Sequence, residues 1–344
     1  MRFIENLFIK SFRGIKNLEL NDLGDINIFV GKNNSGKTSV LEAIGILQYP
    51  LEIGNIIKIG RSREIFNNKS SAYTIFTSMF NKNLKNIEIK ANVKNKSFEI
   101  SIKGNEFSIL TENVYSEIKE FEGQILVKHD NSIFEKNIKL NQNDKDFKII
   151  GDFKLIPIEY VTPAEHLLKN VSNEIIKKGK KKELINLLKI FDKDIISLEM
   201  IEEQKKIVPY IEHKKLGLMP LSTYGDGLKK VLLLGSSIIK AENGVLLIDE
   251  VETAIHIDAL VEFFKWFVKA CNKYKVQVFM TTHSIEIIDS ILESQKDLDN
   301  TSFLKDSLRI ITIKNSTEGE KTKARILNGL EAYDSRIDFG MELR

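Results

Sequence analysis

Residues 31 to 38 place two glycines, a lysine and a threonine in the order GKNNSGKT. Glycine at both ends of such a segment lets the backbone turn tightly and approach a phosphate closely. Lys37 can supply positive charge to the outer phosphates of a nucleotide, and the Thr38 hydroxyl can bind magnesium. The apolar run Ile26–Val30 predicts a buried strand before this segment, and residues 40–47 predict an amphipathic helix after it. The pattern therefore predicts a phosphate-binding loop between a strand and a helix.

A pair of carboxylates follows another strongly apolar run, Val245–Ile248. Asp249 and Glu250 stand at the end of this expected strand, which is where open α/β sheets bind their ligands. We expect Asp249 to share a magnesium ion with Thr38, and Glu250 to polarise the water that attacks the γ-phosphate of ATP. An apolar strand ending in Asp-Glu is a weak signal alone, and it becomes strong downstream of a phosphate-binding loop.

Two short segments in the C-terminal half add candidate phosphate contacts. The sequence LSTYGDG opens an expected helix, so Ser222, Gly225 and Gly227 predict a nest of free N–H groups that binds an anion. His283, after the next expected strand, is placed to contact a γ-phosphate. The alternatives are an ordinary helix cap for Ser222 and an ordinary loop histidine for His283. The order of the four segments along the chain favours a common site.

Hydrophobic spacing predicts the elements that position these residues. Two strands are expected near the N-terminus, and a meander of antiparallel strands from about 72 to 161, where the hydrophobic period is two. Helical spacing over 164–205 predicts a helical hairpin or a small helical lobe. After Pro220 strands alternate with helices, which predicts a parallel sheet within an α/β fold. We expect three parts, an N-terminal lobe 1–163, a helical insertion 164–215 and a C-terminal lobe 216–344.

The composition suits a soluble globular protein, with 42% hydrophobic and 29% charged residues among 344. Its formal charge of +3 is too small to argue for nucleic acid by itself. The single cysteine, Cys271, excludes a disulfide within the chain and is expected to be a buried apolar residue. The sequence shows neither a secretory leader nor an apolar run long enough to span a membrane, so we expect a cytoplasmic protein without a membrane partner.

Five segments occur in the order FRG, GKNNSGKT, STYGDGLKK, VLLIDEVETAIH and FMTTHS. Together they resemble the ABC-type ATPases, and most of all the AAA-family branch that contains the overcoming-lysogenization-defect (OLD) proteins and their stand-alone relatives. The resemblance covers residues 1–50 and 216–344, and the middle of the chain by architecture only. It implies the P-loop fold of an ABC-type ATPase head, with ATP and Mg²⁺ as ligands.

The resemblance also implies a role for each segment. The Walker A loop is Gly31–Ser39, the Walker B pair is Asp249 and Glu250, the switch histidine is His283, and the signature motif is Ser222 with Gly225. The implied nucleotide contacts are Gly31, Asn33, Asn34, Ser35, Gly36, Lys37, Thr38, Ser39, Ser222, Gly225 and Gly227. The implied catalytic residues are Lys37, Glu250 and His283, and the implied magnesium ligands are Thr38 and Asp249. Because this family's signature motif serves the nucleotide of the opposite subunit, we expect a head-to-tail homodimer with ATP at the interface.

Some positions depart from the pattern of transporter ATPases. The signature reads STYGDG instead of LSGGQ, and His256 occupies the position of the D-loop aspartate. A Q-loop glutamine is not identified, because Gln48 follows the Walker A helix too closely and the strand EYVTP offers Thr162 instead. These departures argue against a transporter ATPase subunit, which is the hypothesis from another functional class.

OLD nucleases carry a C-terminal domain with clustered carboxylates. Here Asp297 and Asp299 lie in an expected loop, so the chain resembles the ATPase without its nuclease. The leading hypothesis is an ATP-gated dimeric switch that controls a separate effector, such as a nuclease in anti-phage defence, with 164–205 as the partner surface. The alternative is a DNA-repair ATPase of the recombination-mediator type, which binds DNA directly.

Two basic features of the sequence, Arg13 and a lysine cluster, can each be interpreted in two ways. Arg13 either reaches the nucleotide or is an ordinary arginine at a strand end. A basic cluster either meets a phosphate backbone or is the solvated tip of a hairpin. Its members are Lys177, Lys178, Lys180, Lys181 and Lys182.

Overall fold

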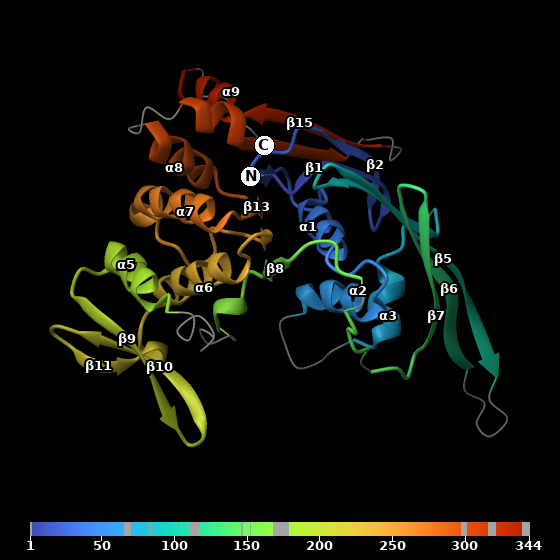
Figure 1. Cartoon of the computed structure of the whole chain (residues 1–344), viewed down its shortest axis with the longest axis horizontal. Helices are drawn as coiled ribbons and strands as arrows, with labels where there is room; N and C mark the ends of the chain where they lie inside the picture. Colours follow the sequence, from blue (N-terminus) through green and yellow to red (C-terminus); the bar gives the residue numbers. More distant parts are fainter. Residues whose placement is uncertain are drawn as a thin grey trace.

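The structure is a computed structural model of the chain (Figure 1). It describes residues 2–64, 70–82, 84–110, 117–145, 147–151, 153–167, 179–296, 301–315 and 321–338. The strands of these residues form two six-stranded sheets and one three-stranded sheet. No helix among the described residues is both long and apolar enough to cross a membrane.

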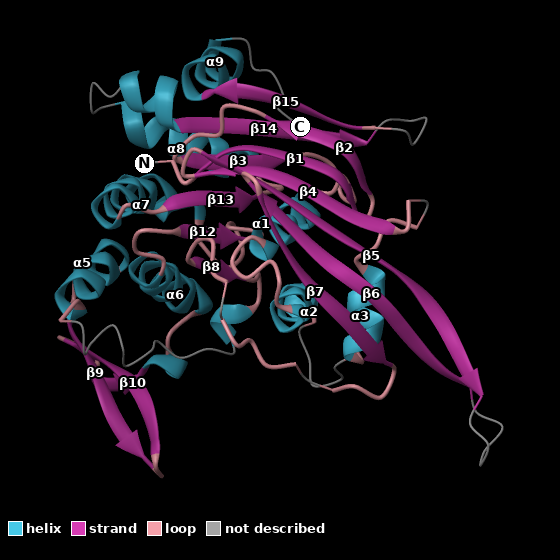
Figure 2. Cartoon of the chain, turned by 45° about the vertical axis from the view of Figure 1, so that its right-hand side comes forward, coloured by secondary structure: helices cyan, strands magenta, loops and turns pink. Residues whose placement is uncertain are grey.

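The sheet that positions the predicted site has the strand order β15-β14-β3-β13-β12-β8 (Figure 2). Its strands are β3 (Ile26–Val30), β8 (Ile158–Val161), β12 (Val245–Ile248), β13 (Gln277–Thr281), β14 (Leu308–Asn315) and β15 (Thr322–Asn328). All neighbours are parallel except β15, which runs antiparallel at one edge. Strands β3, β12 and β13 are buried at every position because both faces of the sheet are covered. The predicted parallel sheet is confirmed, and both predicted lobes contribute strands to it.

A second six-stranded sheet is antiparallel and has the order β2-β1-β4-β5-β6-β7. Its strands are β1 (Ile4–Phe12), β2 (Ile15–Leu20), β4 (Asn86–Val93), β5 (Lys96–Leu110), β6 (Glu117–His129) and β7 (Ser132–Asn141). The meander is confirmed from β4 to β7, but both of its expected ends are wrong. Ala72–Ser78 forms helix α3, and β8 pairs in parallel with β12 in the other six-stranded sheet. The Ser71 hydroxyl caps that helix by accepting from the Thr74 N–H, a local signal that the period-two assignment overlooked.

Helices cover both faces of the parallel sheet. Side chains of α1 (Lys37–Ile46), α2 (Ile53–Gly60) and α3 share one apolar core with residues of both six-stranded sheets. On the other face, α5 (Lys181–Phe191), α6 (Asp226–Lys240), α7 (Leu260–Tyr274) and α8 (Ile285–Lys296) form a second core. Cys271 is buried in this second core, as predicted, and burial raises the pKa of its thiol.

The predicted helical insertion 164–215 is wrong in its second half. Residues 168–178 lie outside the described part, and α5 is helical as expected. Then β9 (Ile195–Glu203), β10 (Lys206–His213) and β11 (Gly217–Pro220) form the three-stranded antiparallel sheet (Figure 1, lower left). Gln204 and Lys205 join β9 to β10 with φ angles of 48° and 65°, the two positive values of a tight hairpin turn. The charged run 202–206 therefore contains a hairpin turn. The division of the chain at 163 and 216 remains a prediction.

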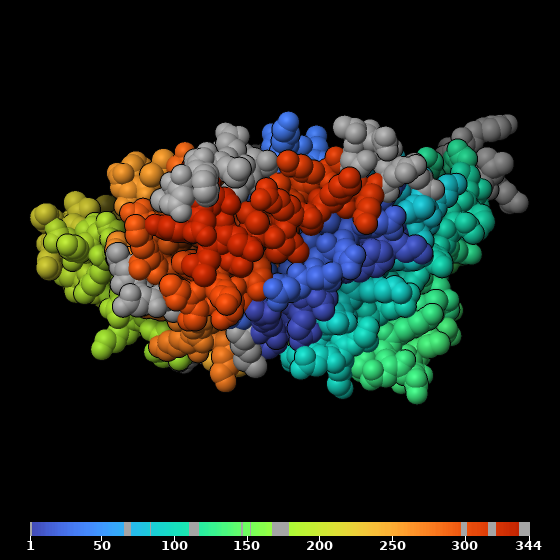
Figure 3. Space-filling view, turned by 90° about the horizontal axis from the view of Figure 1, so that it is seen from above, coloured from blue at the N-terminus to red at the C-terminus, as the bar shows by residue number. Residues whose placement is uncertain are grey.

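The alternation predicted after Pro220 is confirmed, because α6, β12, α7, β13, α8 and β14 follow one another along the chain. The hydrophobic spacing of 255–274 predicts one continuous helix. The structure differs at its start, because the short 3₁₀ turn Ile257–Ala259 precedes α7. Sequence analysis did not predict the C-terminal elements β15 and α9 (Gly329–Tyr333). Seen from above, the C-terminal residues lie along the N-terminal strands (Figure 3), and the Lys16 N–H donates to the Thr322 hydroxyl there.

Two weaker predictions have mixed outcomes. Lys177 and Lys178 of the basic cluster lie outside the described residues, as do Asp297 and Asp299. Within the cluster, Lys181 forms an ion pair of 2.6 Å with Glu199 of β9, and Lys180 lies 3.9 Å from Glu183. These described lysines therefore face acidic groups of their own segment.

Candidate nucleotide-binding site

The phosphate loop lies between β3 and α1, as predicted. Gly31 and Gly36 have φ angles of 144° and 102°, a region that side chains other than glycine rarely adopt. A Cβ atom on Gly31 would also lie 2.5 Å from the Ile313 carbonyl oxygen. Both glycines are therefore required by the backbone. The side chain of Lys37 is folded against the loop, and its Nζ donates to the carbonyls of Gly31 (2.8 Å) and Lys32 (3.1 Å).

The loop fits the group that the sequence predicts for it. The Ser35 hydroxyl is buried and has no hydrogen-bond partner among the described residues. Burying a hydroxyl without a partner costs free energy, so a ligand oxygen at this position would stabilise the loop. Glycines, an orphaned hydroxyl and a lysine held only by carbonyls are together the donor set that a chain of phosphates requires.

Asp249 and Thr38 are brought together as predicted, at the carboxyl ends of β12 and β3. The Thr38 hydroxyl lies 3.1 Å from Oδ1 of Asp249. The same Oδ1 accepts a hydrogen bond of 2.6 Å from the hydroxyl of Thr281, at the end of β13. Thr281 in turn accepts from the Glu250 N–H at 2.8 Å. Sequence reasoning missed Thr281, although its position at a strand end in FMTTHS was the available signal.

The backbone of Glu250 adopts φ = 50°, in the left-handed region. Such a conformation is costly for a residue with a side chain, and it persists where surrounding contacts over-determine it. Burial raises the pKa of the Glu250 carboxyl, and the neighbouring charges of Asp249 and Glu252 raise it further. A carboxylate with a raised pKa is a stronger base than an exposed one, which suits the role predicted for it.

A third carboxylate, Glu252, was not predicted as part of the site. Its Oε1 accepts a hydrogen bond of 2.6 Å from the backbone N–H of His283. Its Oε2 is buried and accepts no hydrogen bond from any described residue. Glu252 thus fixes the backbone of the predicted switch histidine. The repeated acid in DEVE was the sequence signal for this residue.

Two lysines flank the three carboxylates. Burial lowers the pKa of Lys37, and the charges of Asp249, Glu252 and Glu250 oppose this effect. Lys230 of α6 is fully buried, and its Nζ donates to the Pro163 carbonyl at 3.3 Å. Hydrophobic patterning cannot distinguish this lysine from an exposed one, and sequence reasoning missed it.

A buried acid organises the flank of the phosphate loop. Glu42 of α1 is completely buried and forms ion pairs of 2.7 Å with both Arg13 and Arg63. Nη2 of Arg63 also donates to the hydroxyl of Ser39, at 3.0 Å. Arg13 is therefore bound to the Walker A helix, whereas Arg63, after α2, is a second cation at the loop that the sequence did not reveal.

The signature segment lies on the surface. Ser222 and Gly225 are exposed, and Gly225 is the residue before α6. Gly227 lies inside the helix, where a Cβ atom would be 2.8 Å from the Ala254 carbonyl oxygen, so its lack of a side chain serves close packing. Within the described residues, no hydrogen bond or ion pair joins this segment to the phosphate loop of the same chain.

A cavity of about 470 Å³ adjoins the phosphate loop. Its lining includes Arg13, Gly14, Lys16, Asn315 and Lys321. The side-chain amide of Asn315 donates to the carbonyl of Asn34, which connects this cavity to the loop at 3.0 Å. Its lining thus combines cationic side chains, Lys16 and Lys321 among them, with apolar surface.

The Q-loop glutamine stays unidentified. The segment EYVTP, which sequence analysis considered for it, contains β8, and this strand pairs with β12. Thr162 follows the strand there. Thr162 and Gln48 line the same cavity of about 240 Å³ together with Tyr160. The Tyr160 side chain is partly buried and its hydroxyl is fully buried, and burial together with the charge of Asp249 raises the pKa of this phenol well above the ordinary value. Gln48 and Thr162, which sequence analysis did not accept as a Q-loop glutamine, therefore line one cavity next to β8.

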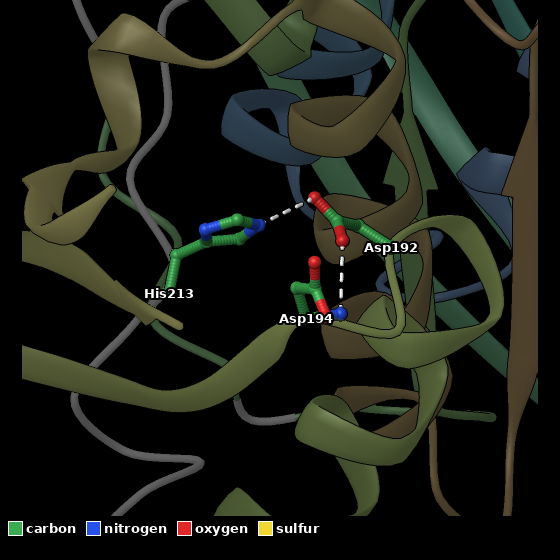
Figure 4. A group of neighbouring side chains, drawn as sticks. All are labelled: Asp192, Asp194 and His213. Carbon is green, nitrogen blue, oxygen red and sulfur yellow. Dashed lines mark hydrogen bonds and ion pairs between the residues drawn. The ribbon is translucent and has the colours of Figure 1, made fainter. Parts of the chain in front are cut away.

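A separate cluster of potential metal ligands joins the three-stranded sheet to α5 (Figure 4). It consists of Asp192, Asp194 and His213. Nδ1 of His213 accepts from two backbone N–H groups, so Nε2 carries the proton and lies 3.2 Å from Asp192. The ammonium of Lys215 forms an ion pair of 2.8 Å with Asp194. Since both ring nitrogens of His213 are engaged, this cluster fixes the sheet to the helix and offers no nitrogen ligand to a metal.

A family model described as "AAA domain, putative AbiEii toxin, Type IV TA system" matches residues 26–289. The protein belongs to this AAA family. Its match spans the phosphate loop, the signature segment, the Walker B pair and His283, whereas the FRG segment at residues 12–14 precedes it.

Relatives of this AAA protein include one named for nucleotide chemistry and others named for DNA replication and repair. An "ATP/GTP phosphatase" of Helicobacter pylori is 26% identical over 337 residues, covering 85% of this chain and 89% of that protein. The DNA replication and repair protein RecF of Shewanella piezotolerans is 37% identical over 76 residues, which is 22% of this chain and 20% of RecF.

Solved structures show the same fold. An Smc head bound to the C-winged helix domain of ScpA has a TM-score of 0.53 at 11% identity, covering 97% of this chain and 100% of that one. An Smc head with an extended coiled coil, bound to the C-terminal domain of ScpA from Pyrococcus furiosus, has a TM-score of 0.50 at 12% identity and covers 99% and 100%. The fold is that of an ABC-type ATPase head, as predicted, and the chain is an AAA ATPase of this type.

Proposed function

We propose that the protein binds ATP with Mg²⁺ at this site and hydrolyses the γ-phosphate. The observation that supports this most is the convergence of Thr38 and Thr281 on Oδ1 of Asp249 beside the phosphate loop. Two strand ends and a helix start contribute to that single point, which is where a phosphate-bound metal ion needs oxygen ligands.

Each residue of the loop has a defined task in this proposal. The backbone of Gly31–Ser39 binds the phosphates, and the ammonium of Lys37 exchanges its two carbonyl partners for phosphate oxygens. Thr38 and Asp249 provide the oxygen ligands for the metal. When bound, Mg²⁺ supplies positive charge that offsets the charge on the phosphates. The cationic cavity beside Asn34 receives the base and ribose.

Glu250 accepts the proton of the attacking water, and its raised pKa suits this role. The imidazole of His283 contacts the γ-phosphate and reports whether it is present. The N–H···Oε1 bond to Glu252 fixes the backbone that carries this imidazole. Water activation and phosphate sensing therefore come from adjacent strand ends, those of β12 and β13.

We further propose that two copies form a head-to-tail dimer with ATP between them. The exposed Ser222 and Gly225 of one copy contact the nucleotide held by the phosphate loop of the other. The separation of the signature segment from the loop of its own chain supports this arrangement, and so does the fold shared with Smc heads. His256, 82% exposed, stands in the D-loop position and faces the same interface.

The biological role that fits best is a switch of the OLD type that controls a separate effector, such as a nuclease of anti-phage defence. The unit formed by α5 and β9–β11 is the candidate partner surface, because β11 runs directly into the signature segment. A second candidate, a DNA-repair ATPase that binds DNA itself, is supported by the similarity to RecF over 76 residues. Salt-sensitive DNA binding by the isolated protein would favour this second role.

The test of the proposed chemistry is phosphate release from ATP and from GTP by the purified protein. Glu250→Gln is expected to lower turnover by about 100-fold or more and to keep nucleotide binding, because only the base is lost. Lys37→Ala is expected to weaken binding itself. Glu262→Gln, on the exposed face of α7, is the matched control. Turnover by Glu250→Gln at the wild-type rate would show that another group activates the water.

A further inference from the structure

The hairpin of β14 and β15 lies outside residues 26–289, which the family model matches, yet it contacts the phosphate loop. β14 pairs in parallel with β3, the strand that leads into the loop. Near the end of this pairing the Ile313 carbonyl oxygen is so close to Gly31 that a Cβ atom there would lie 2.5 Å from it. The backbone of the hairpin therefore restricts the first residue of the loop.

A second contact holds the middle of the phosphate loop. Nδ2 of Asn315, the last residue of β14, donates to the Asn34 carbonyl at 3.0 Å. Asn34 has φ = 60°, in the left-handed region that asparagine tolerates better than most residues. A left-handed residue is part of the backbone pattern that turns successive N–H groups toward an anion. The bond from Asn315 therefore supports a loop conformation that suits phosphate.

Asn315 is held in turn by β15. Its Oδ1 accepts from the Thr322 hydroxyl at 3.4 Å, and Oγ1 of Thr322 accepts from the backbone N–H of Lys16 at 3.3 Å. These two bonds are longer than the bond to Asn34, but Thr322 is only 3% exposed, so water competes little for its hydroxyl. Lys16 belongs to β2, an edge strand of the antiparallel sheet. Three hydrogen bonds thus connect the phosphate loop with the place where the two six-stranded sheets meet (Figure 3).

We propose that Asn315 and Thr322 are positioning residues that hold the phosphate loop in its nucleotide-binding conformation. This inference rests on the proposed nucleotide site. A loop that is already ordered loses less conformational entropy when the nucleotide binds, so these residues raise the affinity. The same hydrogen bonds hold β15 on β2. Occupancy of the loop and the contact between the two sheets therefore stabilise one another, because such linkage is reciprocal.

Asn315→Leu tests the contact with the loop. The variant removes both hydrogen bonds of this side chain at nearly constant size, and the exposed position of Asn315 makes a folding defect unlikely to follow from packing. We expect the Kd for ADP, and for ATP in a Glu250→Gln background, to rise by about fivefold, the change that loss of one hydrogen bond typically produces. The kcat for ATP, measured without Glu250→Gln, should stay within about twofold, because the groups that act on bound nucleotide are unchanged. Titration calorimetry and steady-state turnover measure these values.

Variants of β15 show whether the two residues act as one unit. Thr322→Val should raise the Kd less than Asn315→Leu, because it acts through Asn315, and Thr322→Ser should keep the affinity of the wild type. Combining Thr322→Val with Asn315→Leu should add nothing to the loss caused by Asn315→Leu alone. Lys323→Ala, which changes an exposed side chain next to Thr322, is the matched control and should leave the Kd unchanged. Additive losses in the double variant would overturn the shared role.

Hydrogen exchange at Lys16 gives a readout that does not depend on activity. Saturating ADP should slow exchange of the Lys16 N–H in the wild type, and should leave it unchanged in Asn315→Leu, where the connection is broken. Equal slowing in both proteins would overturn the linkage.

Lys37→Ala separates failure of this inference from failure of the proposed function. If the wild type binds ADP no better than Lys37→Ala, the proposed nucleotide site is wrong. If Lys37→Ala weakens binding while Asn315→Leu binds ADP as tightly as the wild type, only the role of Asn315 and Thr322 is wrong.

Discussion

The Thr38 hydroxyl and Oδ1 of Asp249 lie 3.1 Å apart, although 211 residues separate them along the chain. One residue begins the helix after the phosphate loop and the other ends a buried strand. Parallel pairing of β3, β13 and β12 aligns the three carboxyl ends, so the sheet itself produces this proximity. The contact depends on Thr281, which lies on the strand between them and supports the same oxygen.

Thr281→Val tests this support. The variant keeps the shape of the side chain but removes the hydrogen bonds to Asp249 and to the Glu250 N–H. We expect ATP turnover to fall by about tenfold or more, because the metal ligand and the base both lose a fixed orientation. Nucleotide binding should change much less. Thr282→Val, whose hydroxyl serves only the nearby Ser284 backbone, is the matched control. Equal activity of the two variants would contradict the role of Thr281.

His283→Ala tests phosphate sensing. The imidazole is predicted to act when the γ-phosphate is present, so the variant should lose turnover while its affinity for ADP stays near that of the wild type. Steady-state turnover and ADP binding measure the two quantities. If both fall to the same extent, His283 is a structural residue of the loop.

Mixing two inactive variants tests the composite site. Ser222→Arg blocks the contact to the partner's nucleotide, and Lys37→Ala disables the phosphate loop. Each variant alone should be inactive, while a mixture should regain part of the wild-type activity, because one of the two sites in a mixed dimer is intact. Light scattering of Glu250→Gln with ATP should show a dimer. Full activity of a strictly monomeric protein would rule out the sandwich arrangement.

The buried ion pairs of Glu42 predict a large effect on stability. Glu42→Gln leaves Arg13 and Arg63 without the charge that compensates them. Removing one partner of a buried pair costs about 3–5 kcal/mol, and because Arg63 is partly exposed we expect about 3 kcal/mol from urea unfolding. Nucleotide affinity should also fall, since Arg63 holds the Ser39 hydroxyl. A variant as stable as the wild type would show that these pairs contribute little.

Lys230 predicts how stability depends on pH. Burial lowers its pKa in the folded state to about 8, from an ordinary 10.5. Between these values the unfolded state binds the proton more tightly, so the free energy of unfolding rises with pH. From pH 7.5 to 9.5 the wild type should gain about 2 kcal/mol relative to Lys230→Met, in which this titration is absent. Urea unfolding of both proteins at the two pH values measures this difference. If the free energies of unfolding of the two proteins differed by the same amount at both pH values, the pKa of Lys230 would not be lowered in the folded state.

The elements that sequence analysis located correctly are those that local rules define. The buried strands β3 and β12 are continuous apolar runs, and the phosphate loop is a pattern of glycines that the backbone requires at Gly31 and Gly36. The misassigned insertion shows the limit of such rules. Its turn at Gln204 and Lys205 uses residues that are not typical of positive φ, so only the pairing of β9 with β10 reveals the hairpin.

The residues of the candidate site that were missed share a different property. Thr281, Glu252, Lys230 and Arg63 are defined by what they contact, and their contacts lie far away in sequence. A lysine in a helix is usually solvated, and nothing in GLKKVL distinguishes the buried Lys230 from Lys229. Tertiary packing decides which of the two faces the carboxylates.

The position of β3 in the sheet has a consequence for synthesis of the chain. β3 pairs only with β13 and β14 within the described residues, and Asn27 donates to the Val278 carbonyl, 251 residues later. At about 5–20 residues per second, a ribosome needs roughly 10–50 seconds to reach that partner. The strand that begins the phosphate loop therefore has no sheet to join for most of translation. A nascent chain should acquire protease resistance and nucleotide binding late and together, when β13 and β14 have left the ribosome.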